Sequence, residues 1–218
     1  MIRKSISELI GTFALVFCGT GAIVIDNQTG GGVTHVGVAI TFGLIVMAMI
    51  YTLGDISGAH INPAVSIAFT LAGRLPVKAL GFYIVSQIAG AFLASITLKL
   101  LFPGNDLLGT TLPAGTAWQS FVLEFILTYF LMLVIINVAT GPKEQGLFAG
   151  IAIGSVILLE AIFAGPICGA SMNPARSLAP AVVSGHTEAL WVYLIAPVAG
   201  AALAIPTWKY LHAKSQRI

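Results

Sequence analysis

Charged side chains are scarce in this sequence of 218 residues. Only 8% of the residues are Asp, Glu, Lys or Arg, whereas 57% are hydrophobic. Soluble domains carry roughly 25% charged residues, so this chain cannot cover a water-exposed surface and a soluble globular domain is excluded. Intrinsic disorder is excluded as well, because disordered chains have low hydrophobicity and many charges. The composition indicates an integral membrane protein.

Other absences narrow the function. The net charge of +2 provides no basic patch for nucleic acid. The two cysteines, Cys18 and Cys168, supply no disulfide framework. The sequence has no Gly-rich phosphate loop, no nucleophile motif, and no His or Cys spacing typical of a metal site. We therefore expect neither an enzyme nor a bound metal or cofactor.

Six segments are long and apolar enough to span a bilayer, which takes about 20 residues each. They are 6–25, 34–54, 79–101, 118–138, 147–166 and 188–210. The first resembles the start of a signal peptide, but no small-residue cleavage site follows it and five further spans do. The six spans predict a multi-pass protein of the cell membrane.

Lys and Arg in the short loops set the orientation. With the N-terminus inside, eight of the ten cations fall on the cytoplasmic side: Arg3, Lys4, Arg74, Lys78, Lys143, Lys209, Lys214 and Arg217. The outer loops, 26–33 and 102–117, contain none, and Lys99 can extend outward from the end of its span. Both termini are thus expected in the cytoplasm.

The two halves of the chain repeat each other. Residues 57–66, SGAHINPAVS, align with residues 168–177, CGASMNPARS, with six of ten positions identical. Glu8 and Thr12 match Glu124 and Thr128 near the start of each half. Each half contains three spans, an odd number, so the second half enters the membrane from the opposite side. We expect one domain, 1–218, built from inverted repeats at about 1–101 and 118–210.

A short apolar segment follows each Asn-Pro-Ala. Residues 63–71 and 174–183 give helices of about 14 Å, half of a roughly 30 Å membrane core. We expect two re-entrant half-helices whose N-termini meet near the midplane. Asn62 and Asn173 are suited to cap them, since Asn is favoured at the N-cap and Pro at the next position. Each Asn would keep its NH₂ free for the centre of the pore. The preceding loops would line the pore with carbonyl acceptors, from Gly58, Ala59, His60, Gly169 and Ser171.

These motifs resemble the major intrinsic proteins, the family of aquaporins and glycerol facilitators. The resemblance covers nearly the whole chain. It implies an all-α membrane fold of six transmembrane helices and two half-helices, one pore per subunit, and a homotetramer. It also implies that four filter positions fall on Phe42, Ala161, Ala170 and Arg176. Counting helical residues independently places Phe42 and Ala161 at a similar level in the outer half of the membrane.

The filter residues fit neither common pattern of the family. Water-selective members usually have His where this chain has Ala161, and glycerol facilitators have an aromatic at the place of Ala170 and Asp at that of Ser177. The segment 163–178 is most similar to nodulin-like intrinsic proteins and their bacterial relatives. That similarity implies a passive channel for water and small uncharged solutes: glycerol, with urea and neutral metalloid acids as candidates. Phe42 departs from the Trp or Ala common in that group. Arg176 would exclude protons and ions; its alternative role is to brace loop carbonyls.

Two rival functions stay open. One is a strictly water-selective channel, which the same fold allows. The other is a proton-coupled alternating-access transporter, in which the buried Glu8 and Glu124 relay protons. We expect instead that these two carboxylates accept hydrogen bonds from the loop backbone. His60 is interpreted as a structural histidine or a pH gate, and Cys168 as a packing residue. Glu160, which does not obey the repeat, would face the subunit interface or reach a loop N–H.

Overall fold

Six long helices make up most of the structure, a computed structural model that describes residues 1–140 and 146–213. They are α1 (Ile2–Gln28), α2 (Thr34–Ser57), α4 (Val77–Leu101), α5 (Ala117–Thr140), α7 (Ala149–Cys168) and α9 (Leu190–Ala213). All six are long and apolar enough to cross a membrane, so the six expected spans are confirmed. Three cations expected on the cytoplasmic side, Lys143, Lys214 and Arg217, lie outside the described residues.

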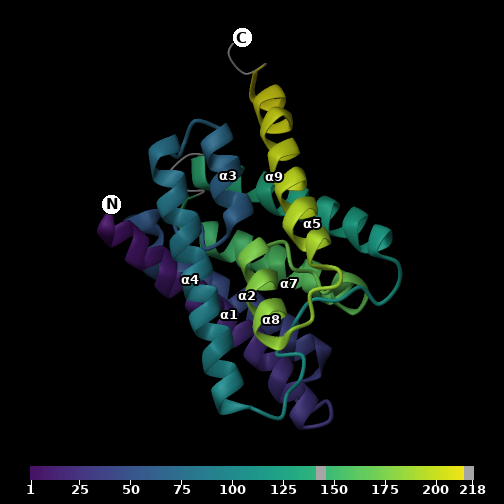
Figure 1. Ribbon diagram of the computed structural model, residues 1–218. Helices are drawn as coiled ribbons and strands as arrows, with labels where there is room; N and C mark the ends of the chain where they lie inside the picture. The colour runs from purple at the N-terminus through teal and green to yellow at the C-terminus, as the bar shows by residue number, and fades with distance from the viewer. Residues whose placement is uncertain (141–145, 214–218) are drawn as a thin grey trace.

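Two short helices confirm the expected half-helices. They are α3 (Pro63–Leu71) and α8 (Pro174–Ser184), of 9 and 11 residues. The second ends one residue later than predicted, at a left-handed Gly185 that closes its last turn. In Figure 1, α3 lies in the upper part of the molecule and α8 in the lower part. Both have Asn at the N-cap and Pro at the first helical position, as the sequence indicated.

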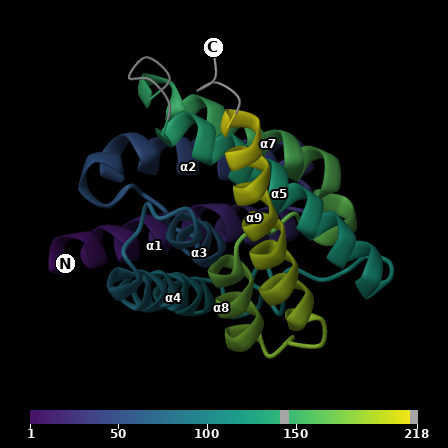
Figure 2. The same cartoon turned by 90° about the horizontal axis from the view of Figure 1, so that it is seen from above.

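The helix packing repeats between the halves. Helix α1 packs along α4, and the matching α5 packs along α9 (Figures 1 and 2). Both contacts depend on a glycine, because a methyl group at Gly90 would strike the carbonyl of Leu9, and one at Gly200 that of Phe125. Small residues permit such close helix contacts in membranes. The short helices join the halves, since α3 also packs on α9, and α8 on α4.

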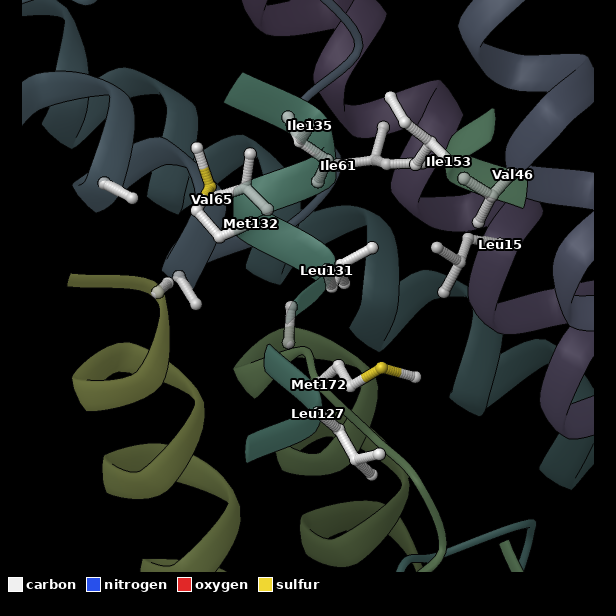
Figure 3. Packing of buried hydrophobic residues seen from close by; sticks show 14 of the residues in the cluster. Leu15, Val46, Ile61, Val65, Leu127, Leu131, Met132, Ile135, Ile153 and Met172 are labelled. Carbon is white, nitrogen blue, oxygen red and sulfur yellow. The ribbon is translucent and has the colours of Figure 1, made fainter. Parts of the chain in front are cut away.

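The core surrounds the meeting point of the two half-helices. Figure 3 shows Ile61 and Met172, from the loops that precede α3 and α8, among apolar side chains of the long helices. Large apolar side chains are also exposed on the outer surface of the bundle, including Val85, Leu100 and Phe163. A surface of this kind suits hydrocarbon rather than water.

Candidate functional site

The loops before the half-helices share an unusual backbone. Ala59 and Ile61 have φ of 46° and 43°, and the matching Ala170 and Met172 have φ of 41° and 52°. Positive φ is uncommon outside glycine and is costly for a β-branched residue such as Ile61. A conformation of this kind persists only where the surroundings impose it. Its occurrence at both repeats indicates that both loops are held in place for function.

Two buried carboxylates hold these loops. Glu8 accepts hydrogen bonds from the backbone N–H of His60 at 2.9 Å and of Ile61 at 2.7 Å. Glu124 accepts from the N–H of Ser171 and of Met172, both at 2.7 Å. The helices that carry these carboxylates thus fix the strained residues directly. The geometry matches the expected role of the two carboxylates as acceptors for the loop backbone.

The carboxylate of Glu8 has two further partners that sequence reasoning missed. The Ser57 hydroxyl donates to it at 2.7 Å, and the Gln87 amide donates at 2.8 Å. The repeat carries no signal for these contacts, because Cys168 replaces Ser57 and Pro197 replaces Gln87 in the second half. The two halves therefore hold equivalent loops with different side chains.

Asn62 and Asn173 cap the half-helices and also connect them. Their side-chain oxygens accept from the N–H of Ala64 at 2.9 Å and of Ala175 at 3.1 Å. Each amide nitrogen donates across the centre, Asn62 to the carbonyl of Met172 at 2.8 Å and Asn173 to that of Ile61 at 2.9 Å. The expectation that each NH₂ is wholly free is therefore wrong. One N–H of each amide ties the two loops together, and the second has no protein partner among the described residues.

A cavity of about 450 Å³ passes the two asparagines. It extends from Tyr51 and Asp55, near the end of α2, to Phe42 and Arg176. Its lining includes all but one of the residues expected to line the pore or form the filter: Asn62, Asn173, Phe42, Ala161, Ala170, Arg176, Gly58, Ala59, His60 and Ser171. Gly169 is the exception, since it caps α7 and faces Thr111 rather than the cavity. Apolar side chains such as Val46 and Ile153 cover much of the remaining wall.

The end of the cavity at Arg176 combines one cation, one aromatic ring and two small residues. The guanidinium of Arg176 lies 5.0 Å from the centre of the Phe42 ring. Phe42 packs against α1 at Gly19, where no side chain would fit. Ala161 and Ala170 also line this end, and their side chains are methyl groups without a polar atom. The structure thus brings together the four filter positions that the resemblance implied.

Arg176 is braced by the protein and also lines the cavity. Its Nη1 donates to the carbonyl of Gly109 at 2.8 Å, and its Nε has no hydrogen-bond partner among the described residues. Gly109, in the loop between α4 and α5, packs onto Thr20 with φ of 72°. Sequence reasoning treated this loop only as an outer connection without cations. Because the brace uses only Nη1, Nη2 keeps its N–H groups for a solute.

A chain of hydroxyl groups supports the second half-helix. Thr111 donates to Ser177 at 2.7 Å, and Ser177 and Ser171 are hydrogen-bonded at 2.5 Å. Ser171 donates in turn to the carbonyl of Asn173 at 2.9 Å. The chain joins the α4–α5 loop to the pore asparagine. Ser177 belongs to the repeat, whereas no pattern in the sequence pointed to Thr111.

Three further residues are placed as follows. The ring of His60 stacks on Phe69 with centroids 4.6 Å apart, and its Nδ1 lies 3.1 Å from the Ser66 hydroxyl, which matches the structural interpretation. Cys168 is fully buried, as a packing residue would be. Neither placement expected for Glu160 is found. This side chain is buried within the subunit at 6% exposure, and its enclosed Oε2 has no partner in the described part of the chain.

Comparison with known proteins identifies the family. The family model described as "Major intrinsic protein" matches residues 1–208. Nodulin-26 of Glycine max is 49% identical over 96% of this chain and 77% of its own length. Aquaporin NIP1-1 of Oryza sativa subsp. japonica is 50% identical over 96% of this chain and 73% of its own.

A solved structure has the same fold. The aquaglyceroporin from Plasmodium falciparum superposes with a TM-score of 0.83 at 27% identity, over 99% of this chain and 97% of that one. Its architecture agrees with the six long and two short helices described above. The chain therefore belongs to the major intrinsic protein family, a family of membrane channels rather than enzymes.

Proposed function

We propose that this protein is a passive channel for water and small uncharged solutes, with glycerol as the principal organic solute. The observation that carries the proposal is the composition of one end of the cavity, where Arg176 and Phe42 line the wall together with two alanines. A polyol needs hydrogen-bond donors for its hydroxyl groups and an apolar surface for its C–H groups. Arg176 supplies the donors, Phe42 supplies the apolar face, and the alanines leave the room. The similar Plasmodium falciparum protein is itself named an aquaglyceroporin.

Urea and neutral metalloid acids are further solutes of the proposed pore. Both are small and uncharged and carry several hydrogen-bonding groups. They lack the long C–H edge that suits the Phe42 ring, so their passage depends mainly on width and on Arg176. The likeness of the segment 163–178 to nodulin-like intrinsic proteins supports these solutes, and Nodulin-26 and NIP aquaporins are among the similar proteins.

Proton and ion exclusion is assigned to the centre and the filter together. The two half-helices direct their positive N-terminal ends at the midplane, where a cation is disfavoured. The second N–H of Asn62 and of Asn173 faces the same region as a donor only, so a water molecule there must turn its oxygen toward both. This orientation interrupts the hydrogen-bonded chain that proton conduction requires. Carbonyls of Gly58, Ala59, His60 and Ser171 provide acceptors on either side; Gly169 is left out of this set.

The two buried carboxylates are assigned a structural role. Glu8 and Glu124 use their oxygens on backbone N–H groups of the pore loops. A proton relay would need these oxygens free to exchange protons with the cavity. Their occupied positions favour the channel over a proton-coupled transporter.

Stopped-flow light scattering on proteoliposomes tests the proposed solutes. Water, glycerol and urea permeabilities are measured on the same vesicles, with empty liposomes as the control. We expect all three to exceed the empty liposomes, with a low activation energy and no saturation. Water permeability without measurable glycerol or urea permeability would replace the proposal with the strict water channel.

The assembly and orientation are proposed as a homotetramer with both termini in the cytoplasm. The family resemblance supports the tetramer, and the positive charges near α1, α3 and α9 support the orientation. The whole chain, 1–218, would form one channel unit from two inverted halves, 1–101 and 118–210. Light scattering in detergent measures the assembly. Labelling of single cysteines placed at Thr29 and Gly73 measures the orientation, with only the first expected to react from outside.

A further inference from the structure

Helices α2 and α7 form the wall that carries two of the filter residues. They run side by side in opposite directions and approach closely where Gly43 meets Gly154; a methyl group on Gly43 would lie 2.7 Å from the Gly154 carbonyl oxygen. Phe42 lies on α2 at this crossing, next to Gly43, whereas Ala161 lies on α7 about two turns beyond it toward the filter end. The distance between the two side chains therefore depends on what holds the helices together past the crossing.

A proline weakens α7 at that end. Pro166 has no backbone N–H, so the carbonyl of Ile162, four residues earlier, cannot receive its usual helical hydrogen bond. An unpaired carbonyl is costly within a membrane-spanning segment unless another group supplies a donor. Ile162 is the residue directly after Ala161, so the vacant acceptor lies beside the filter.

His35 supplies the missing donor from the other helix. Its Nε2 lies 2.9 Å from the Ile162 carbonyl oxygen. Because a carbonyl oxygen only accepts, His35 must carry a hydrogen on Nε2. Gly165 makes room for the ring, since a methyl group there would lie 2.7 Å from His35 Cε1. His35, Gly165 and Pro166, none of which lines the cavity, thus together form one contact between α2 and α7.

We propose that His35 is a positioning residue that sets the width of the filter by fixing the end of α7 to α2. It touches no solute; it acts through Ile162 on the neighbouring Ala161, and through α2 on Phe42, which lies two turns further along. This inference rests on the proposed role of these residues as the filter. Without the contact, the turn of α7 that carries Ala161 can move away from α2, and the opening becomes wider.

Four proteins test the proposal: wild type, His35→Phe, Pro166→Ala and the double variant. Phe keeps a ring over Gly165 but has no N–H donor. Ala at position 166 restores the helical N–H to Ile162, so His35 is no longer needed. We expect His35→Phe to raise the ratio of erythritol to water permeability by about 2- to 13-fold, the range that loss of one ordinary hydrogen bond allows. In the Pro166→Ala background the same change should have no effect.

His35→Gln provides the rescue. Its amide nitrogen stands the same number of bonds from Cβ as Nε2 of His, so it should keep the wild-type ratio. Melting temperatures of the four proteins in detergent provide a second test. We expect His35→Phe to lower the melting temperature in the wild type but not in the Pro166→Ala background. A melting-temperature coupling with no change in the permeability ratio would overturn the positioning role, and absence of coupling would overturn the contact itself.

Failure of the proposed function remains distinguishable from failure of this inference. A wild-type protein that passes water but no glycerol refutes the wide filter. The same four proteins then test the inference through water permeability alone. We expect His35→Phe to have a higher water permeability than the wild type, and the double variant to have the same water permeability as Pro166→Ala. Equal water permeability in all four proteins would refute the role of His35 in that case too.

Discussion

Replacing Ala161 with His should narrow the proposed filter at a position that lines the cavity beside Phe42 and Arg176. Ala161 is 7% exposed and Ala170, which lines the same cavity, is 8% exposed, so the wall has little slack to absorb an imidazole. The new ring must therefore project into the opening beside Arg176 and Phe42. Inserting bulk into a closely packed site costs about 1–3 kcal/mol.

We take the same range, about 1–3 kcal/mol, for the extra barrier that a solute meets when it passes the new ring. Each 1.36 kcal/mol on a barrier lowers a rate by about tenfold, so we expect glycerol permeability to fall by about 5- to 150-fold. Water is smaller than the remaining opening and gains a polar partner in the imidazole. We expect water permeability to stay within about twofold of the wild type, since a hydrogen bond exchanged for another changes little free energy.

The assay is stopped-flow light scattering on proteoliposomes of the wild type, Ala161→His and Ala161→Ser. Serine adds a polar group with little volume, and so separates polarity from width. We expect Ala161→Ser to keep glycerol permeability near the wild type. An equal loss of glycerol permeability in both variants, or an equal loss of water and glycerol in Ala161→His, would refute the argument from width.

Three further variants test the other parts of the site. Arg176→Val should raise proton and ion leak while the flux of neutral solutes persists, because the fixed charge and its hydrogen-bond donors are lost. A fluorescent pH dye inside vesicles measures the proton leak. A variant that does not fold would indicate that bracing the loop is the only role of Arg176. Glu8→Ala should lower the free energy of unfolding by about 2–6 kcal/mol, measured by denaturation in detergent, because two buried backbone N–H groups lose their acceptor at about 1–3 kcal/mol each. Gly200→Ala should lower the melting temperature, since the added methyl group meets the Phe125 carbonyl, whereas Gly81→Ala, with open space around it, should not.

The repeat explains why much of the fold could be predicted. Two Asn-Pro-Ala segments in register, each followed by a stretch too short to span, required half-helices from opposite sides. The cap residues also follow from local chemistry, because Asn and Pro have strong preferences for the first two positions of a helix. Glu8 and Glu124 could be assigned to the loop backbone because buried carboxylates need donors and both obey the repeat.

The remaining contacts depend on three-dimensional features that no local pattern encodes. Nothing in the sequence indicates that Ile61, a β-branched residue, adopts positive φ, or that its carbonyl accepts from Asn173 across the repeat. The brace on Arg176 comes from Gly109, in a loop whose composition indicates only a connection. Glu160 departs from the repeat, and its burial next to the filter wall has no explanation in the contacts of the described residues.

Glycerol and proton fluxes measured in the same proteoliposomes test the central claim most directly. The claim is that a pore open to neutral solutes is closed to protons by Asn62, Asn173 and Arg176. Vesicles loaded with a pH dye are exposed first to a glycerol gradient and then to a pH jump. The account predicts glycerol entry well above that of empty liposomes and a proton flux equal to theirs. Proton flux that rises together with glycerol entry would contradict it.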